Sequence, residues 1–186
     1  MTVVFLDANV LVPITLTNVL LTAAEEGLFQ VHWSSEVVQE AVDAIADIRP
    51  GIPEASIGRR FDAMNCAFED GLVSGDSRVL ASLNLPDPDD RHVVAAAIAA
   101  EATIILTENL KDFPESVLKP FRLVAMTPDQ FLSSLLKENG SIVADVIRRV
   151  AQTLVRPPRS VEDILIALER THVTQFTRDF RAFLGT

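Results

Sequence analysis

Short apolar runs alternate along the chain with longer segments whose apolar positions recur at helical spacing. The runs at residues 3–6, 30–33, 102–107 and 121–126 are rich in β-branched and aromatic side chains and predict strands. The periodic segments predict helices at residues 16–26, 36–47, 57–70, 77–83, 89–101 and 128–136. Because strands alternate with helices, we expect an α/β fold with a central parallel sheet between helical layers.

The pattern changes near residue 137, where strand-like runs cease. A break at residues 138–140 precedes predicted helices at 141–155, 160–170 and 173–184, with Pro157-Pro158 interrupting the first two. The chain has 186 residues, 48% of them hydrophobic, which suits one real core with an appendage. We expect two domains, an α/β domain over residues 1–136 and a helical carboxy-terminal extension over residues 137–186.

The composition excludes several classes of protein. No segment approaches the roughly 20 apolar residues of a transmembrane helix, and Asp7 precedes any signal-peptide core. Cys66 is the single cysteine, so neither a disulfide framework nor a zinc site of several cysteines is expected. We therefore expect a soluble, cytoplasmic protein with no membrane partner.

The net charge of −10 argues at first against a nucleic-acid partner, since phosphate binding normally leaves a basic surface. The acidity is uneven, however: residues 1–136 hold 8 Lys and Arg against 20 Asp and Glu, whereas residues 137–186 hold 8 against 6. An acidic site that carries divalent cations inverts the local electrostatics. The charge is then compatible with a phosphodiester substrate.

Carboxylates occur where predicted strands end or predicted helices begin. Asp7 follows the first strand, Glu40 lies near the edge of an apolar helix face, Asp87 and Asp90 stand at the start of the apolar helix, and Asp112 follows the strand at 102–107. In parallel sheets the ligand site lies beyond the carboxyl ends of the strands. An oxygen-only set of ligands is what hard cations prefer.

Each acid also has a purely structural explanation. Asp7 and Asp87 suit helix caps, Glu40 suits a solvated boundary position, and Asp89 is expected to face solvent. Three like charges within four residues nevertheless cost energy unless cations offset them, so we interpret Asp90 as a metal ligand.

Uncharged polar side chains accompany these acids. Asn9, Thr107 and Asn109 offer hydrogen-bonding groups at the strand ends. The histidines are scattered: we expect His32 to pack in a strand and His92 to be at most an auxiliary group near Asp90.

Four segments resemble, in the same order, the motifs of PIN-domain proteins, and more closely those of VapC-like toxins of bacterial toxin–antitoxin pairs. They are residues 6–11 (LDANVL), Trp33-Ser34 with Glu40, residues 85–93 (LPDPDDRHV) with the alanines at 95–97, and residues 107–114 (TENLKDFP). The resemblance covers about residues 1–136, and its most specific part is the DPDDRH string. The helices around Pro157-Pro158 resemble an extension found in a longer subgroup.

The resemblance implies a three-layer α/β/α fold and a catalytic quartet of Asp7, Glu40, Asp90 and Asp112. Of these, Asp7, Asp90 and Asp112 would bind the metal. The supporting residues would be Asn9, Asp87, Thr107 and Asn109.

The resemblance further implies a water activated by Mg²⁺ or Mn²⁺ that attacks an RNA phosphodiester. It also implies a cognate antitoxin that inserts into the acidic site, and a homodimer. The physical chemistry agrees, because divalent ions acidify water and stabilise charge on phosphoryl oxygens.

The chain departs from the family pattern at two positions. Many PIN proteins have an Asp where Asn109 stands, so the fourth carboxylate is either absent or supplied by Asp112. Asn18 stands where related toxins often have an acid. The sequence leaves open whether one metal ion binds or two.

The carboxy-terminal helices carry several arginines with more than one interpretation. Arg148, Arg149, Arg156 and Arg159 suit phosphate contacts with RNA, yet surface ion pairs explain them as well. Alternatively, the apolar faces of these helices bind the antitoxin or a second copy. Those faces include Ile164, Leu165, Leu168 and Phe180.

Two other functions compete with the nuclease. A haloacid-dehalogenase phosphatase also begins with a strand-end Asp, but Asn9 stands where its second acid is needed. A PIN-type scaffold that has lost its metals is the main alternative, and metal affinity distinguishes it. No motif identifies the RNA.

Overall fold

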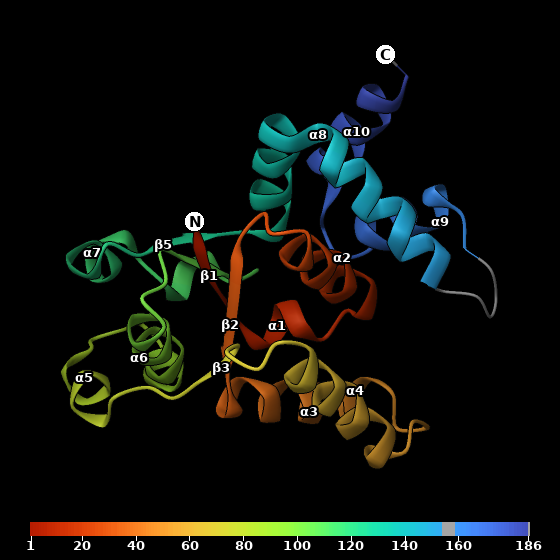
Figure 1. Ribbon diagram of the computed structural model, residues 1–186. Coiled ribbons are helices and arrows are strands. Elements are labelled where there is room, and N and C mark those ends of the chain that lie inside the picture. The colour runs from red at the N-terminus through yellow and green to blue at the C-terminus, as the bar shows by residue number, and fades with distance from the viewer. Residues whose placement is uncertain (154–158, 186) are drawn as a thin grey trace. The chain divides into compact units, whose positions relative to one another are not determined.

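The computed structural model describes residues 1–153 and 159–185 (Figure 1). The chain forms two compact units, one of residues Met1–Val12 and Gln30–Met126 and one of residues Pro13–Phe29 and Thr127–Thr186. We call them the sheet unit and the helical unit. In the described parts of the chain, no helix is long and apolar enough to cross a membrane.

The sheet unit is built on five parallel strands in the order β3-β2-β1-β4-β5. The strands are β1 (Val3–Leu6), β2 (Gln30–Ser34), β3 (Leu72–Val73), β4 (Ile104–Leu106) and β5 (Val124–Met126). The central strand β1 pairs with β2 and β4, so that Val4 lies beside both Val31 and Ile104. This arrangement confirms the expected parallel α/β fold.

Helices and short turns connect the strands of the sheet unit. The helices are α1 (Ala8–Leu11), α3 (Ser35–Ile48), α4 (Glu54–Ala67), α5 (Ser77–Ser82), α6 (Arg91–Ala99) and α7 (Glu115–Leu118). The 3₁₀ turns are η1 (Pro88–Asp90), η2 (Leu110–Asp112) and η3 (Lys119–Phe121). Helix α6 packs against β1, β2 and β4, and residues 93–97 are fully buried, as its apolar composition predicted.

Several boundaries differ from the sequence-based expectation. The helix predicted from residue 89 starts as the 3₁₀ turn η1, because Pro88 and the cap at Asp87 begin a tighter turn before Arg91. The strand predicted from residue 121 starts at Val124, since Arg122 adopts a left-handed conformation (φ +59°) that ends η3. The pattern gave no sign of α1, which is a single turn.

The helical unit consists of α2 (Ile14–Glu25), α8 (Pro128–Thr153), α9 (Val161–Glu169) and α10 (Thr174–Leu184). Helix α8 joins two predicted helices, and its non-helical residue Asn139 lies within the predicted break. The end of the helix predicted to residue 155, together with Pro157-Pro158, lies outside the described residues.

The apolar faces of α9 and α10 are covered within the protein. Ile164, Leu165, Leu168 and Phe180 are at most 1% exposed, and α9 and α10 pack on each other and on α8. The alternative that these side chains bind an antitoxin or a second copy is therefore wrong, because they form the core of the helical unit.

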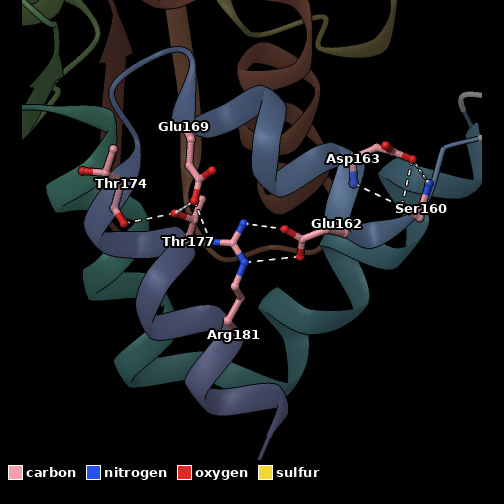
Figure 2. A network of polar contacts seen from close by, with 7 residues as sticks. All are labelled: Ser160, Glu162, Asp163, Glu169, Thr174, Thr177 and Arg181. Atoms are coloured by element: carbon pink, nitrogen blue, oxygen red, sulfur yellow. Dashed lines mark hydrogen bonds and ion pairs between the residues drawn. The ribbon is translucent and has the colours of Figure 1, made fainter.

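An exposed network of charges ties α9 to α10 (Figure 2). Arg181 pairs with Glu162 and with Glu169, each at 2.6 Å, and Thr177 donates a hydrogen bond to Glu169. Ser160 and Asp163 form a capping box that begins α9.

Candidate active site

Asp7 is a buried carboxylate at the carboxyl end of the central strand. Its side chain is 5% exposed and receives three hydrogen bonds. The backbone N–H of Ala8 donates to Oδ1 (2.7 Å), while Thr107 Oγ1 (2.7 Å) and Asn9 Nδ2 (2.6 Å) donate to Oδ2. Burial raises the pKa of Asp7, although these bonds oppose the rise. Asp7 thus caps α1, as one interpretation expected, and also presents a buried acid at the sheet edge.

Asn9 and Thr107 link the ends of β1 and β4. Asn9 Nδ2 also reaches Thr107 Oγ1 (3.2 Å), and Asn9 Oδ1 accepts a hydrogen bond from the Glu108 backbone (3.0 Å). Thr107 is fully buried, and its Oγ1 accepts from the Asn109 backbone (3.0 Å). The polar residues predicted as supporting groups therefore fix the position of Asp7.

Asp90 shares its surroundings with other acids. Its side chain is partly buried and makes no capping hydrogen bond. Burial, followed by the negative charges of Asp7, Asp87 and Asp112, raises the pKa of Asp90 to about 6. Carboxylates from three separate segments are therefore close enough for their charges to oppose the ionisation of Asp90.

The remaining acids of this region differ in their exposure. Asp87 caps η1 by accepting from the Asp89 backbone (2.9 Å), and both residues are exposed, as expected for Asp89. Asp112 is partly buried in η2, where Asn109 Nδ2 donates to its Oδ2. Asn109 thus holds Asp112 in place.

Glu40 is joined to the cluster through His92. His92 Nε2 lies 2.8 Å from Glu40 Oε1, and the side chains are 17% and 48% exposed respectively. Burial raises the pKa of Glu40, His92 opposes this, and the charge of Asp7 adds to the rise. From the sequence, His92 was predicted to be at most an auxiliary group near Asp90. Its position two residues after Asp90 was the available signal, but the contact with α3 was not visible in the sequence.

We call Asp7, Glu40, Asp90 and Asp112 the acidic cluster. Within residues 1–153 and 159–185, no three His, Cys, Asp or Glu side chains form a ready-made metal-binding group. The donors are nevertheless all carboxylate oxygens, which suit a hard divalent cation. The raised pKa of Asp90, to which the charges of Asp7, Asp87 and Asp112 contribute, marks a concentration of negative charge that such an ion would offset. The residues present therefore fit Mg²⁺ or Mn²⁺ in their chemistry.

The arginines suggested for RNA contact lie in the helical unit. Arg148 pairs with Asp145 (2.7 Å), and Arg149 pairs with Glu25 (2.9 Å) and Glu26 (2.8 Å). Arg159 is exposed, and Arg156 lies outside the described residues. The surface ion pairs foreseen as the alternative are thus present for Arg148 and Arg149.

Comparison with known proteins gives three findings. The family model of the PIN domain matches residues 3–111 of the sequence, and the family model of the VapC50 C-terminal domain matches residues 128–182. The protein named "Putative ribonuclease VapC50" of Mycobacterium tuberculosis is 38% identical over 129 residues, which cover 67% of this chain and 75% of that protein. No solved structure matches the chain. Asp7, Glu40 and Asp90 lie inside the first match, and Asp112 follows its last residue.

Proposed function

The chain belongs to the PIN-domain family, and on that premise we propose that it is a divalent-metal-dependent endoribonuclease, the toxin of a bacterial toxin–antitoxin pair. The observation that carries this proposal is the position of Asp7, buried at the end of the central strand and close enough for its charge to oppose the ionisation of Asp90 and Glu40. An apolar core gives no reason to bury a carboxylate beside other carboxylates, whereas a cation-binding site does.

We assign the metal to Asp7, Asp90 and Asp112. When bound, Mg²⁺ or Mn²⁺ makes a water molecule more acidic and offsets the charge that develops on phosphoryl oxygens. Thr107 and Asn9 orient Asp7 through hydrogen bonds to Oδ2, and Asn109 orients Asp112.

Glu40 is the acid that we assign to accept the proton of the attacking water. Its raised pKa brings it closer to neutral pH than an ordinary glutamate, which favours a general base. His92 fixes the Glu40 carboxylate by its contact with Oε1, which limits the directions that the carboxylate takes.

The partners follow from the relationship to the VapC protein. We infer a cognate antitoxin that covers the acidic cluster, a homodimer, and a cytoplasmic location. The division into a nuclease domain at residues 1–136 and an extension at 137–186 is part of the same proposal, as is RNA contact by Arg148, Arg149, Arg156 and Arg159. Co-expression with the product of a neighbouring gene, followed by co-purification, tests the antitoxin.

The nuclease is tested by cleavage of total cellular RNA with purified protein in the presence of Mg²⁺ or Mn²⁺. The decisive variant is Asp90→Asn, and Asp89→Asn is the matched control, because it removes the same charge from the exposed neighbour. We expect cleavage by wild type and Asp89→Asn, and none by Asp90→Asn or with a chelator. Cleavage that survives Asp90→Asn contradicts the assigned site.

A non-catalytic PIN scaffold is the second candidate, favoured by the uncharged Asn109 in place of the acid that the resemblance to PIN proteins implies. Isothermal titration with Mn²⁺ separates the two functions. A folded protein that binds no metal supports the scaffold, whereas metal binding that Asp90→Asn abolishes supports the nuclease.

A further inference from the structure

A cavity of about 440 Å³ lies beside the edge strand β5 in the sheet unit. Its walls are mainly apolar and include Leu110, Phe113, Leu118 and Val124. Two basic residues, Lys119 and Arg122, and one acidic residue, Glu115, also line it. The cavity therefore combines an apolar interior with charged side chains among which the cations are in excess.

The turn η2 joins this cavity to the acidic cluster. In a 3₁₀ turn, residues three apart lie on the same side. Asn109 and Asp112 form one such pair and are hydrogen-bonded to each other beside Asp90, whereas Leu110 and Phe113 form the next pair and line the cavity. The cavity therefore lies on one side of η2, and Asp112 of the acidic cluster lies on another side of the same short turn.

The cationic side chains stand out in a protein with a net charge of −10. Lys119 has a weak partner, Glu115, at 3.9 Å, and both side chains are largely exposed. Arg122 forms no ion pair with any residue that the structure describes. Cations beside an apolar cavity match the chemistry of a nucleotide, whose flat base is apolar on both faces and whose phosphate is anionic.

We propose that this cavity is a subsite for one unpaired nucleobase of the RNA substrate, with Lys119 and Arg122 contacting the flanking phosphates. The proposal rests on the ribonuclease function proposed above. Residues of the sheet unit would then select one RNA base next to the phosphodiester that the acidic cluster acts on. Anionic phosphates account for the two cationic side chains on the cavity wall, whereas a purely apolar partner does not.

The test is cleavage of a randomised 12-nucleotide single-stranded RNA library, with sequencing of the products. Ala125→Leu places a larger side chain on the cavity wall. Lys119→Ala with Arg122→Asn removes the charges, and Asn suits the left-handed backbone at residue 122. Arg59→Ala, which removes an exposed charge elsewhere in the sheet unit, is the control.

We expect the wild type and the control to prefer one base next to the cut. Ala125→Leu should flatten that preference and lower kcat/KM by about tenfold, the scale of one lost base contact. The double variant should keep the preference but lose about tenfold in kcat/KM on every sequence, with a weaker dependence on salt. Circular dichroism and Mn²⁺ binding should match wild type in both.

Three outcomes overturn the subsite. Wild-type cleavage with an unchanged base preference in Ala125→Leu removes the subsite and leaves the nuclease intact. Unchanged cleavage combined with loss of a dimer in either variant assigns the cavity to contact between two copies. A wild type that binds Mn²⁺ but neither binds nor cuts the library refutes the ribonuclease and the subsite together.

Discussion

Replacing Asp90 with Asn should make the metal-free protein more stable at neutral pH. Burial and the charges of Asp7, Asp87 and Asp112 oppose ionisation of Asp90 and raise its pKa from 3.8 to about 6. Asparagine keeps nearly the same shape without the charge. The variant therefore removes an electrostatic cost that the metal-free wild type carries.

The size of the effect follows from this pKa. A shift from 3.8 to about 6 corresponds to at most about 3 kcal/mol. Because Asp90 is only partly buried, solvent screening reduces the expected gain to about 1 kcal/mol. The folded chain holds the proton more tightly than the unfolded chain, so the wild type loses stability as pH rises from about 4 to about 6. The advantage of Asp90→Asn is absent below about pH 4 and complete above about pH 6.

The assay is urea and thermal unfolding in a chelator across this pH range, with Asp89→Asn as the control. A gain of about 1 kcal/mol raises the unfolding temperature by about 2–4 °C for a chain of this size. Added Mn²⁺ should stabilise the wild type but not Asp90→Asn. The reasoning is refuted if Asp90→Asn is no more stable than Asp89→Asn at pH 8, or if its gain is equal at pH 4 and pH 8.

Three further substitutions test other parts of the structure. Thr107→Val removes the 2.7 Å hydrogen bond to Asp7. It should lower the free energy of unfolding in urea by about 2 kcal/mol and weaken Mn²⁺ binding. Wild-type values for both would contradict a role for this hydrogen bond. His92→Leu removes the contact that holds Glu40 and should lower kcat for RNA cleavage more than it changes KM. His92→Gln should partly restore kcat, because its amide donates a hydrogen bond. Wild-type kinetics in His92→Leu would show that the contact is dispensable. Arg181→Met breaks two exposed ion pairs and should lower the unfolding temperature slightly at low salt and less at high salt. A loss of stability that does not depend on salt would argue against an electrostatic origin.

The sheet and the strand-end acids were accessible from sequence because both follow from local patterns. Short β-branched runs that end in polar strings predict parallel strands with a site at their carboxyl ends. Asp7 and Thr107 directly follow β1 and β4, which are neighbours in the sheet, and this explains their direct hydrogen bond. The burial of α6 followed from its nearly continuous apolar composition.

Long-range packing was not accessible in the same way. The contact of Glu40 with His92 joins α3 to α6, and no periodicity reports on the distance between two helices. Likewise, the apolar face of α9 predicts that another surface covers it but does not identify that surface. In the structure Leu165 and Leu168 pack within the helical unit. The pattern also gave no reason to group α2 with residues 127–186.

A metal ion held at Asp7 is the central requirement of the proposed nuclease, and the rate of RNA cleavage against Mn²⁺ concentration tests this requirement most directly. Chelator-treated wild type and Asp7→Asn are compared on the same RNA, with folding checked by circular dichroism. We expect no cleavage without metal, a saturable rise in rate for the wild type, and no rise for Asp7→Asn. Cleavage by the wild type in chelator, or a wild-type rate in Asp7→Asn, would contradict it.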